Sequence, residues 1–247
     1  MQLVRSTNPN KDTHTRRRTV EEQTVVSQIP LLKTAILLLC LWCPTVVAET
    51  ARVHLHVEVT PSSSKLIDEV TVALLPKTSE LRSLLNQAPI DVAITQKDAQ
   101  FQPFVTLVQR GASVDFPNLD AFAHHVYSFS KAMAFELPLY SGDDVQRVTA
   151  TNPGVVPLGC NIHDWMLGYI LVVDSPFFGS LENGRAQFPK VPVGNYSVAL
   201  WHPSMKKPWQ QDLAVSKQQI EHQLQLPNKL RRVRPRPSPL GHDLEDY

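Results

Sequence analysis

The 247-residue sequence has few cysteines, little net charge and no long helical pattern. Lysine and arginine number 24 against 23 acidic residues, so the formal net charge is +1 and bulk electrostatics does not favour a nucleic-acid partner. No long segment has the apolar spacing of an amphipathic helix, which disfavours an α-helical protein. The only cysteines are Cys40, Cys43 and Cys160.

The longest apolar run lies near the N-terminus. Its uncharged part, Thr34 to Ala48, is short for a membrane span, which needs about 20 residues. The small residues before Glu49 are typical of a signal-peptidase site, and Arg16-Arg17-Arg18 supplies basic residues upstream. We therefore predict that residues 1–48 are a signal peptide with a long n-region, that the protein is periplasmic, and that no stable membrane span remains after cleavage. An uncleaved anchor is the alternative.

Cleavage at this position would leave one thiol. Cys40 and Cys43 would be removed with the leader, so they would not form a redox pair, and Cys160 would stay alone. A lone thiol in an oxidising compartment is prone to oxidation or cross-linking. A metal that holds it as a thiolate gives a reason for its presence.

Short alternating segments, separated by Pro, Asn, Asp and Gly, predict an all-β sandwich or barrel. Residues 52–60 alternate strictly, with Val53, Leu55 and Val57 on one face and His54 and His56 on the other. The two histidines are either a second metal pair or part of a solvated face, and such alternation favours the solvated face. Residues 61–64 are expected to form a turn, and 78–87 a short helix or a polar loop. The other expected strands include 70–75, 105–108, 126–129, 155–158, 169–173, 212–215 and 220–226.

One motif carries most of the chemical information. Cys160, His163 and Met166 occur with two residues between each pair, directly before an expected strand, and His124-His125 precede another. Two imidazoles, a thiolate and a weak axial Met are the ligand set of a blue-copper site. One loop cannot surround an ion, so one histidine must come from a different strand. Adjacent strand residues point to opposite faces, so His124 and His125 cannot both bind.

Two other chemistries fit less well. Zinc is a poor partner for a thioether. A cysteine hydrolase would need an oxyanion hole and an oriented base beside Cys160, and nothing in the sequence marks them. We therefore expect no catalytic residues and one copper ion.

The metal motif resembles that of the blue-copper cupredoxins, with a loop of amicyanin length. The family resemblance implies a Greek-key β-sandwich, one type 1 copper ion, and His124, Cys160, His163 and Met166 as its ligands. His125 stands where the family usually has an Asn that ties the two ligand loops together. The wider match is to exported cupredoxin-like proteins labelled as methylamine-utilisation proteins, and it rests on the blocks at 116–118, 124–129, 135–140 and 159–168.

The segments that flank the cupredoxin-like region resemble a second kind of domain. Residues 52–76 with 184–226 resemble a small transthyretin-like or carboxypeptidase-regulatory-like β-sandwich, through Val191-Pro-Val-Gly-Asn-Tyr196. The expected organisation is a signal peptide at 1–48, flanking-sandwich strands at 49–95 and 176–228, a cupredoxin domain at 96–175, and a disordered tail at 229–247.

The resemblance implies outer-sphere electron transfer without an enzymatic reaction. The partner would be a redox protein such as a c-type cytochrome, an oxidase or a dehydrogenase. In such folds the imidazole edge of His163 would reach the surface and pass the electron, with Phe122, Trp165 and Leu167 as candidates for the surrounding shell. A copper carrier or storage protein and a non-redox interaction module are the alternatives.

Overall fold

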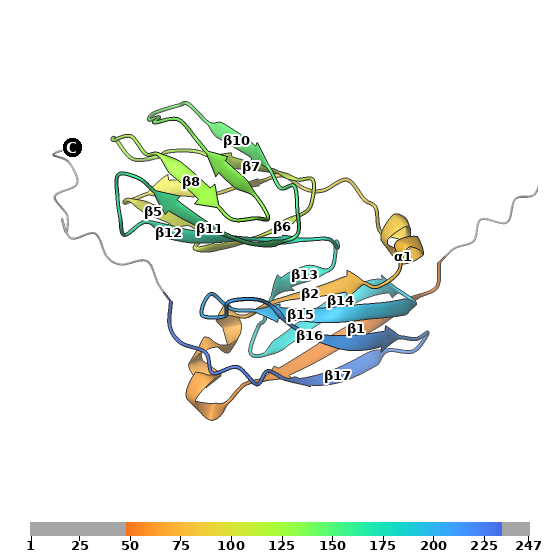
Figure 1. Cartoon of the computed structure of the whole chain (residues 1–247). Coiled ribbons are helices and arrows are strands. Elements are labelled where there is room, and N and C mark those ends of the chain that lie inside the picture. Colours follow the sequence, from red (N-terminus) through yellow and green to blue (C-terminus); the bar gives the residue numbers. More distant parts are fainter. Residues whose placement is uncertain (1–47, 234–247) are drawn as a thin grey trace, which may run out of the picture. The chain divides into compact units, whose positions relative to one another are not determined.

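The computed structural model describes residues 48–233 (Figure 1). Strands dominate this part of the chain, so the predicted all-β class is confirmed. No helix among these residues is long and apolar enough to cross a bilayer. The predicted signal peptide, except Ala48, and the tail beyond Val233 lie outside the described residues.

The segments on either side of the central region form two sheets that share one apolar core. The alternation expected of residues 52–60 is confirmed in β1, where Val53, Leu55 and Val57 are at most 2% exposed. β1 pairs with β14 antiparallel and with β17 parallel. The first sheet has the order β14-β1-β17, with bounds Arg185–Pro192, Thr50–Glu58 and Ile220–Gln225. The second has the order β13-β2-β15-β16, with bounds Phe178–Ser180, Thr71–Pro76, Gly194–Trp201 and Trp209–Val215.

Two short helices lie between the early strands. The turn expected at residues 61–64 is wrong, because Pro61–Glu69 forms a 3₁₀ helix (η1). Proline suits its first turn, and the buried Ser63 fixes it by accepting a hydrogen bond from the Leu230 N–H at 2.9 Å. A helix between residues 78 and 87 is confirmed as α1, Ser79–Leu84, whose N-cap Thr78 accepts a hydrogen bond from the Leu81 N–H.

The central region has a five-stranded sheet, a three-stranded sheet and a hairpin around a second apolar core. The five-stranded sheet has the order β6-β12-β11-β8-β9, with bounds Val105–Gln109, Leu167–Val173, Gly154–Cys160, Val126–Phe129 and Ala134–Glu136. The three-stranded sheet has the order β10-β7-β3, with bounds Gln146–Thr149, Ser113–Phe116 and Val92–Ala93. The hairpin joins β4, Thr95–Lys97, to β5, Gln100–Gln102.

Strand pairing in the five-stranded sheet brings the two halves of the metal motif together. β11 pairs antiparallel with β8 through Gly159 opposite Tyr127 and Cys160 opposite Val126. The residues just before β8 therefore lie beside the loop that follows β11, although the sequence separates them by more than 30 positions.

Candidate metal centre

Three buried donor atoms converge at one end of the five-stranded sheet. Cys160 Sγ lies 3.8 Å from His124 Nδ1 and 3.8 Å from His163 Nδ1. The donor atoms of all three residues lie within 4.8 Å of one another. His124 is fully buried, and Cys160 and His163 are each 4% exposed. This is the one group of three or more potential His, Cys or carboxylate ligands found among residues 48–233.

The separations fit a single metal ion. Donors that bind a metal at about 2.0–2.3 Å and lie 3.8 Å apart subtend about 120° at the ion. A trigonal arrangement of one thiolate and two imidazoles is the equatorial ligand set of blue-copper sites. The residues present therefore fit copper.

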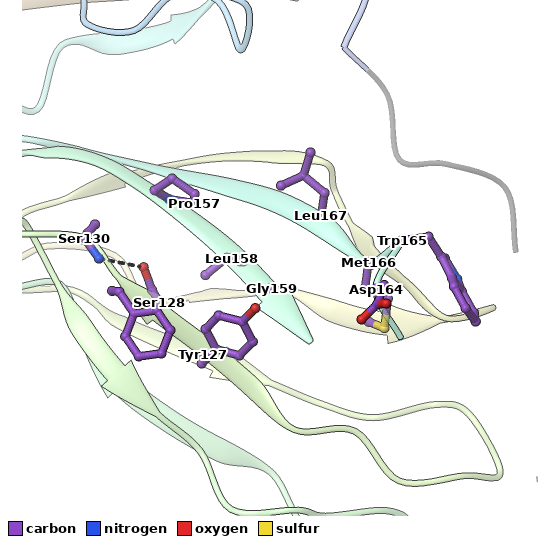
Figure 2. Close-up of a pocket in the computed structure, with 11 residues that line it drawn as sticks. Tyr127, Ser128, Ser130, Pro157, Leu158, Gly159, Asp164, Trp165, Met166 and Leu167 are labelled. Carbon is purple, nitrogen blue, oxygen red and sulfur yellow. Dashed lines mark hydrogen bonds between the residues drawn. The ribbon is translucent and has the colours of Figure 1, made fainter. Parts of the chain in front are cut away.

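The fourth expected ligand, Met166, closes the same loop. Its side chain is 3% exposed and belongs to the core cluster that contains Cys160. Its N–H donates to the carbonyl oxygen of His163 at 2.9 Å, so the chain turns within the loop before β12 begins at Leu167. Figure 2 shows the thioether at this end of the sheet, beside Asp164 and Trp165.

The structure separates the two adjacent histidines. His124 joins the donor cluster, whereas His125 Nε2 lies 3.1 Å from Glu136 Oε1 and its side chain is 21% exposed. The backbone of His125 still supports the site, because its carbonyl oxygen accepts a hydrogen bond from the Asn161 N–H at 3.0 Å. This bond ties the two ligand segments together where the family resemblance leads one to expect an Asn side chain.

His124 is held from behind by a carboxylate. Its Nε2 lies 2.8 Å from Asp120 Oδ2. Asp120 also accepts hydrogen bonds from the backbone N–H groups of Asp98, at 2.7 Å, and Ala99, at 3.0 Å, in the turn between β4 and β5. Its own N–H donates to Asn118 Oδ1 at 3.0 Å. Sequence reasoning missed Asp120, and its one local signal is its place four residues before His124.

The pKa values of Cys160 and His163 shift toward the forms that bind a metal, whereas the pKa of His124 shifts toward the protonated form, so a metal must displace a proton there. Burial alone would raise the pKa of the Cys160 thiol, but hydrogen bonds from His124 and from the loop backbone lower it. Burial alone would lower the pKa of His124, but its hydrogen bonds to Asp120 and Cys160 raise it. Burial and the nearby charge of His124 lower the pKa of His163, which favours a neutral imidazole. A thiolate and a neutral imidazole are the forms that ligate metals.

Aromatic rings surround His163. Its ring centre lies 5.3 Å from that of Phe122 and 5.1 Å from that of Trp165, and both of these side chains are half-buried. At 4% exposure His163 is almost wholly buried, and the expectation that its imidazole edge reaches the surface stays a prediction. The two aromatic side chains pack against its ring.

A groove of about 580 Å³ runs from the metal loop along the sheet. Trp165, Met166 and Leu167 line one end, and Tyr127 lines it beside Gly159 (Figure 2). The ring of Tyr127 sits so close to Gly159 that a Cβ there would lie 2.8 Å from Tyr127 Cζ. Of the three expected shell residues, Trp165 and Leu167 line this groove, and Phe122 packs against His124 and His163.

No model of a known protein family matches the chain, and a search of curated proteins gave no match. Among solved structures, the chain is similar to a purple cupredoxin from Nitrosopumilus maritimus, with 20% identity, 33% of this chain and 99% of that chain covered, and a TM-score of 0.31. The chain is also similar to the reduced Cu(I) form of an amicyanin mutant, with 17% identity, 42% of this chain and 99% of that chain covered, and a TM-score of 0.31. A third similar structure is a Cu-containing nitrite reductase from Thermus scotoductus SA-01, with 21% identity, 47% of this chain and 28% of that chain covered, and a TM-score of 0.33. Because these sequence identities and TM-scores are low, the assignment of the metal centre rests on the geometry of its donor atoms.

Proposed function

We propose that the protein binds one copper ion in a type 1 site of cupredoxin kind and serves in outer-sphere electron transfer. The observation that carries the proposal is the convergence of the Cys160 thiolate with two imidazole Nδ1 atoms in a buried cluster. Bound copper would supply a one-electron couple between its +1 and +2 states.

The protein groups have distinct roles in this proposal. Cys160 would provide the thiolate, His124 and His163 the two imidazoles, and Met166 the weakly bound thioether that together hold the copper ion. The packing of Cys160 and Met166 in the core and the hydrogen bond between His124 and Asp120 would keep ligand movement small when the copper changes its oxidation state. The half-buried rings of Phe122 and Trp165, which pack against the His163 ring, would offer a path for the electron between the site and solvent.

Burial of the donors favours electron transfer over copper delivery. The three clustered donors and Met166 are at most 4% exposed. A carrier must release its ion to another protein, which requires access to the ligands, whereas an electron can leave through packed side chains. A carrier or storage role is therefore the second candidate.

We further propose that the protein acts in the periplasm with a redox partner such as a c-type cytochrome, an oxidase or a dehydrogenase. The sequence pattern of residues 1–48 supports export. Leu119, at 65% exposure, and Ile162, at 47%, lie in the two loops that carry the ligands, and exposed apolar side chains there suit transient docking. The amicyanin-like loop length and the resemblance to methylamine-utilisation proteins support, within this proposal, a role beside amine oxidation.

The ligand assignment is tested by paired variants of the adjacent histidines. His124→Ala is expected to abolish the thiolate-to-copper absorption, and His125→Ala to leave it in place, because only His124 lies in the cluster. Reversible reduction and reoxidation of the purified protein at an electrode tests electron transfer. Loss of copper on each reduction would favour the carrier role instead.

A further inference from the structure

The position of Asp120 is fixed more tightly than that of an ordinary surface carboxylate. Its side chain is 7% exposed. Backbone N–H groups of Asp98 and Ala99 donate to its two oxygens, and Oδ2 also faces His124 Nε2 at 2.8 Å. Asn118 holds its main chain. The carboxylate is thus built into the fold directly behind one donor imidazole.

We propose that Asp120 is a positioning residue that fixes the His124 ring with Nδ1 toward the metal and stabilises the oxidised over the reduced copper centre. This inference rests on the proposed function. A carboxylate that accepts the Nε2–H of a ligating imidazole leaves Nδ1 free as the donor and raises its basicity. A negative charge in a buried site also favours the more positive of two metal states, because the surroundings screen it weakly.

A purely structural role makes a different prediction. Asp120 also anchors the β4–β5 turn, where Asp98 and Ala99 adopt left-handed backbone angles with φ of 55° and 50°. If holding this turn were its whole role, removal of its charge would change the free energy of unfolding but leave the reduction potential of the bound copper unchanged.

The test compares Asp120→Asn with the wild-type full-length protein loaded with copper. Removal of the charge is expected to weaken Cu(II) binding about 10–100-fold, as for other partners of metal ligands, and to weaken Cu(I) binding less. Each factor of ten by which Cu(II) affinity falls more than Cu(I) affinity raises the one-electron potential by about 59 mV. Affinities come from chelator competition and the potential from voltammetry.

Glu136→Gln is the matched control. It removes the same charge from a carboxylate beside His125, a pair that is more exposed to solvent and lies outside the donor cluster. It is expected to leave the potential at the wild-type value. Asp120→Glu, which keeps the charge, is expected to restore the potential at least in part. Equal potentials in wild type and a folded, copper-loaded Asp120→Asn variant would overturn the inference.

A measurement on the wild type covers the case in which Asp120→Asn does not fold. Nitrogen-15 NMR of the histidine rings is expected to show a proton on His124 Nε2 that exchanges slowly with water. A bare Nε2 would contradict the positioning role. Absence of a copper spectrum in the wild type would instead refute the proposed function, so the two failures can be told apart.

Discussion

Asn118 fixes the loop that carries His124 and links this loop to Tyr140, which makes its removal informative. The residue is 4% exposed. Its Nδ2 donates to the carbonyl oxygens of Phe122, at 2.9 Å, and Tyr140, at 3.2 Å, and its Oδ1 accepts from the Asp120 N–H at 3.0 Å. Tyr140 forms the bridge that positions the backbone of His124. Asn118→Ala should therefore loosen the His124 segment as well as reduce stability.

The expected loss follows from the number of contacts. Three hydrogen bonds at about 0.5–1.5 kcal/mol each predict a loss of about 2–4 kcal/mol, since the buried groups left behind are not solvated. For a chain of this size each kcal/mol lowers Tm by about 2–4 °C, so a decrease of roughly 4–16 °C is expected. Chelator competition should also show weaker copper binding.

Thermal unfolding followed by circular dichroism measures the stability change. Asn152→Ala is the control, because Asn152 is exposed and its hydrogen bonds to Ala132 and Thr151 are longer, at 3.3 and 3.5 Å. It should change stability by less than about 0.5 kcal/mol. A Tm of Asn118→Ala within about 2 °C of that of the control, which is about half the smallest expected decrease, would refute the reasoning about the buried contacts of Asn118.

Three further predictions concern other parts of the fold. Burial raises the pKa of Tyr196 to about 12, above the value of about 10 expected in the unfolded chain. The contribution of the neutral phenol to stability is therefore complete below pH 10, and about 2–3 kcal/mol is lost as the pH rises to 12. Tyr196→Phe should remove this part of the decrease in unfolding free energy at alkaline pH, measured by denaturant titration, and an unchanged decrease would contradict the assignment. Gly159→Ala forces Tyr127 to move, because the added Cβ would lie 2.8 Å from its ring, and should lower the free energy of unfolding by about 1–3 kcal/mol; the same loss in a Tyr127→Ala background would exclude this contact as the cause. Arg147→Ala removes a two-point ion pair with Asp115, but the Arg147 side chain is 60% exposed and solvent screens the pair, so the midpoint of urea unfolding should stay close to that of the wild type. A clearly lower midpoint would show that the pair is not screened.

Strand pattern was the part of the fold that sequence could predict. β1 alternates apolar and polar residues because one face packs on the core, and that alternation is visible without the structure. The 3₁₀ helix at Pro61–Glu69 was not foreseen, since it depends on Ser63 meeting Leu230 from the far end of the described chain. Local composition carries no information on that contact.

In the candidate site, too, some features could be predicted from the sequence and others could not. The spacing of Cys160, His163 and Met166 places three donors on one loop, and strand alternation requires a choice between His124 and His125. The structure makes that choice through the pairing of β8 with β11. Asp120 and the burial of His163 could not be predicted, because both depend on segments distant in sequence, the β4–β5 turn and the loop that carries Phe122.

The visible and electron paramagnetic resonance spectra of the purified protein after addition of Cu(II), recorded beside those of Cys160→Ala, test the central claim most directly. We predict an intense thiolate-to-copper absorption band that the variant lacks, because Cys160 Sγ is the one thiol donor of the cluster and lies 3.8 Å from both imidazole Nδ1 atoms. A protein that binds no Cu(II), or binds it equally well without Cys160, would contradict the copper centre and leave a β-sandwich interaction protein as the better explanation.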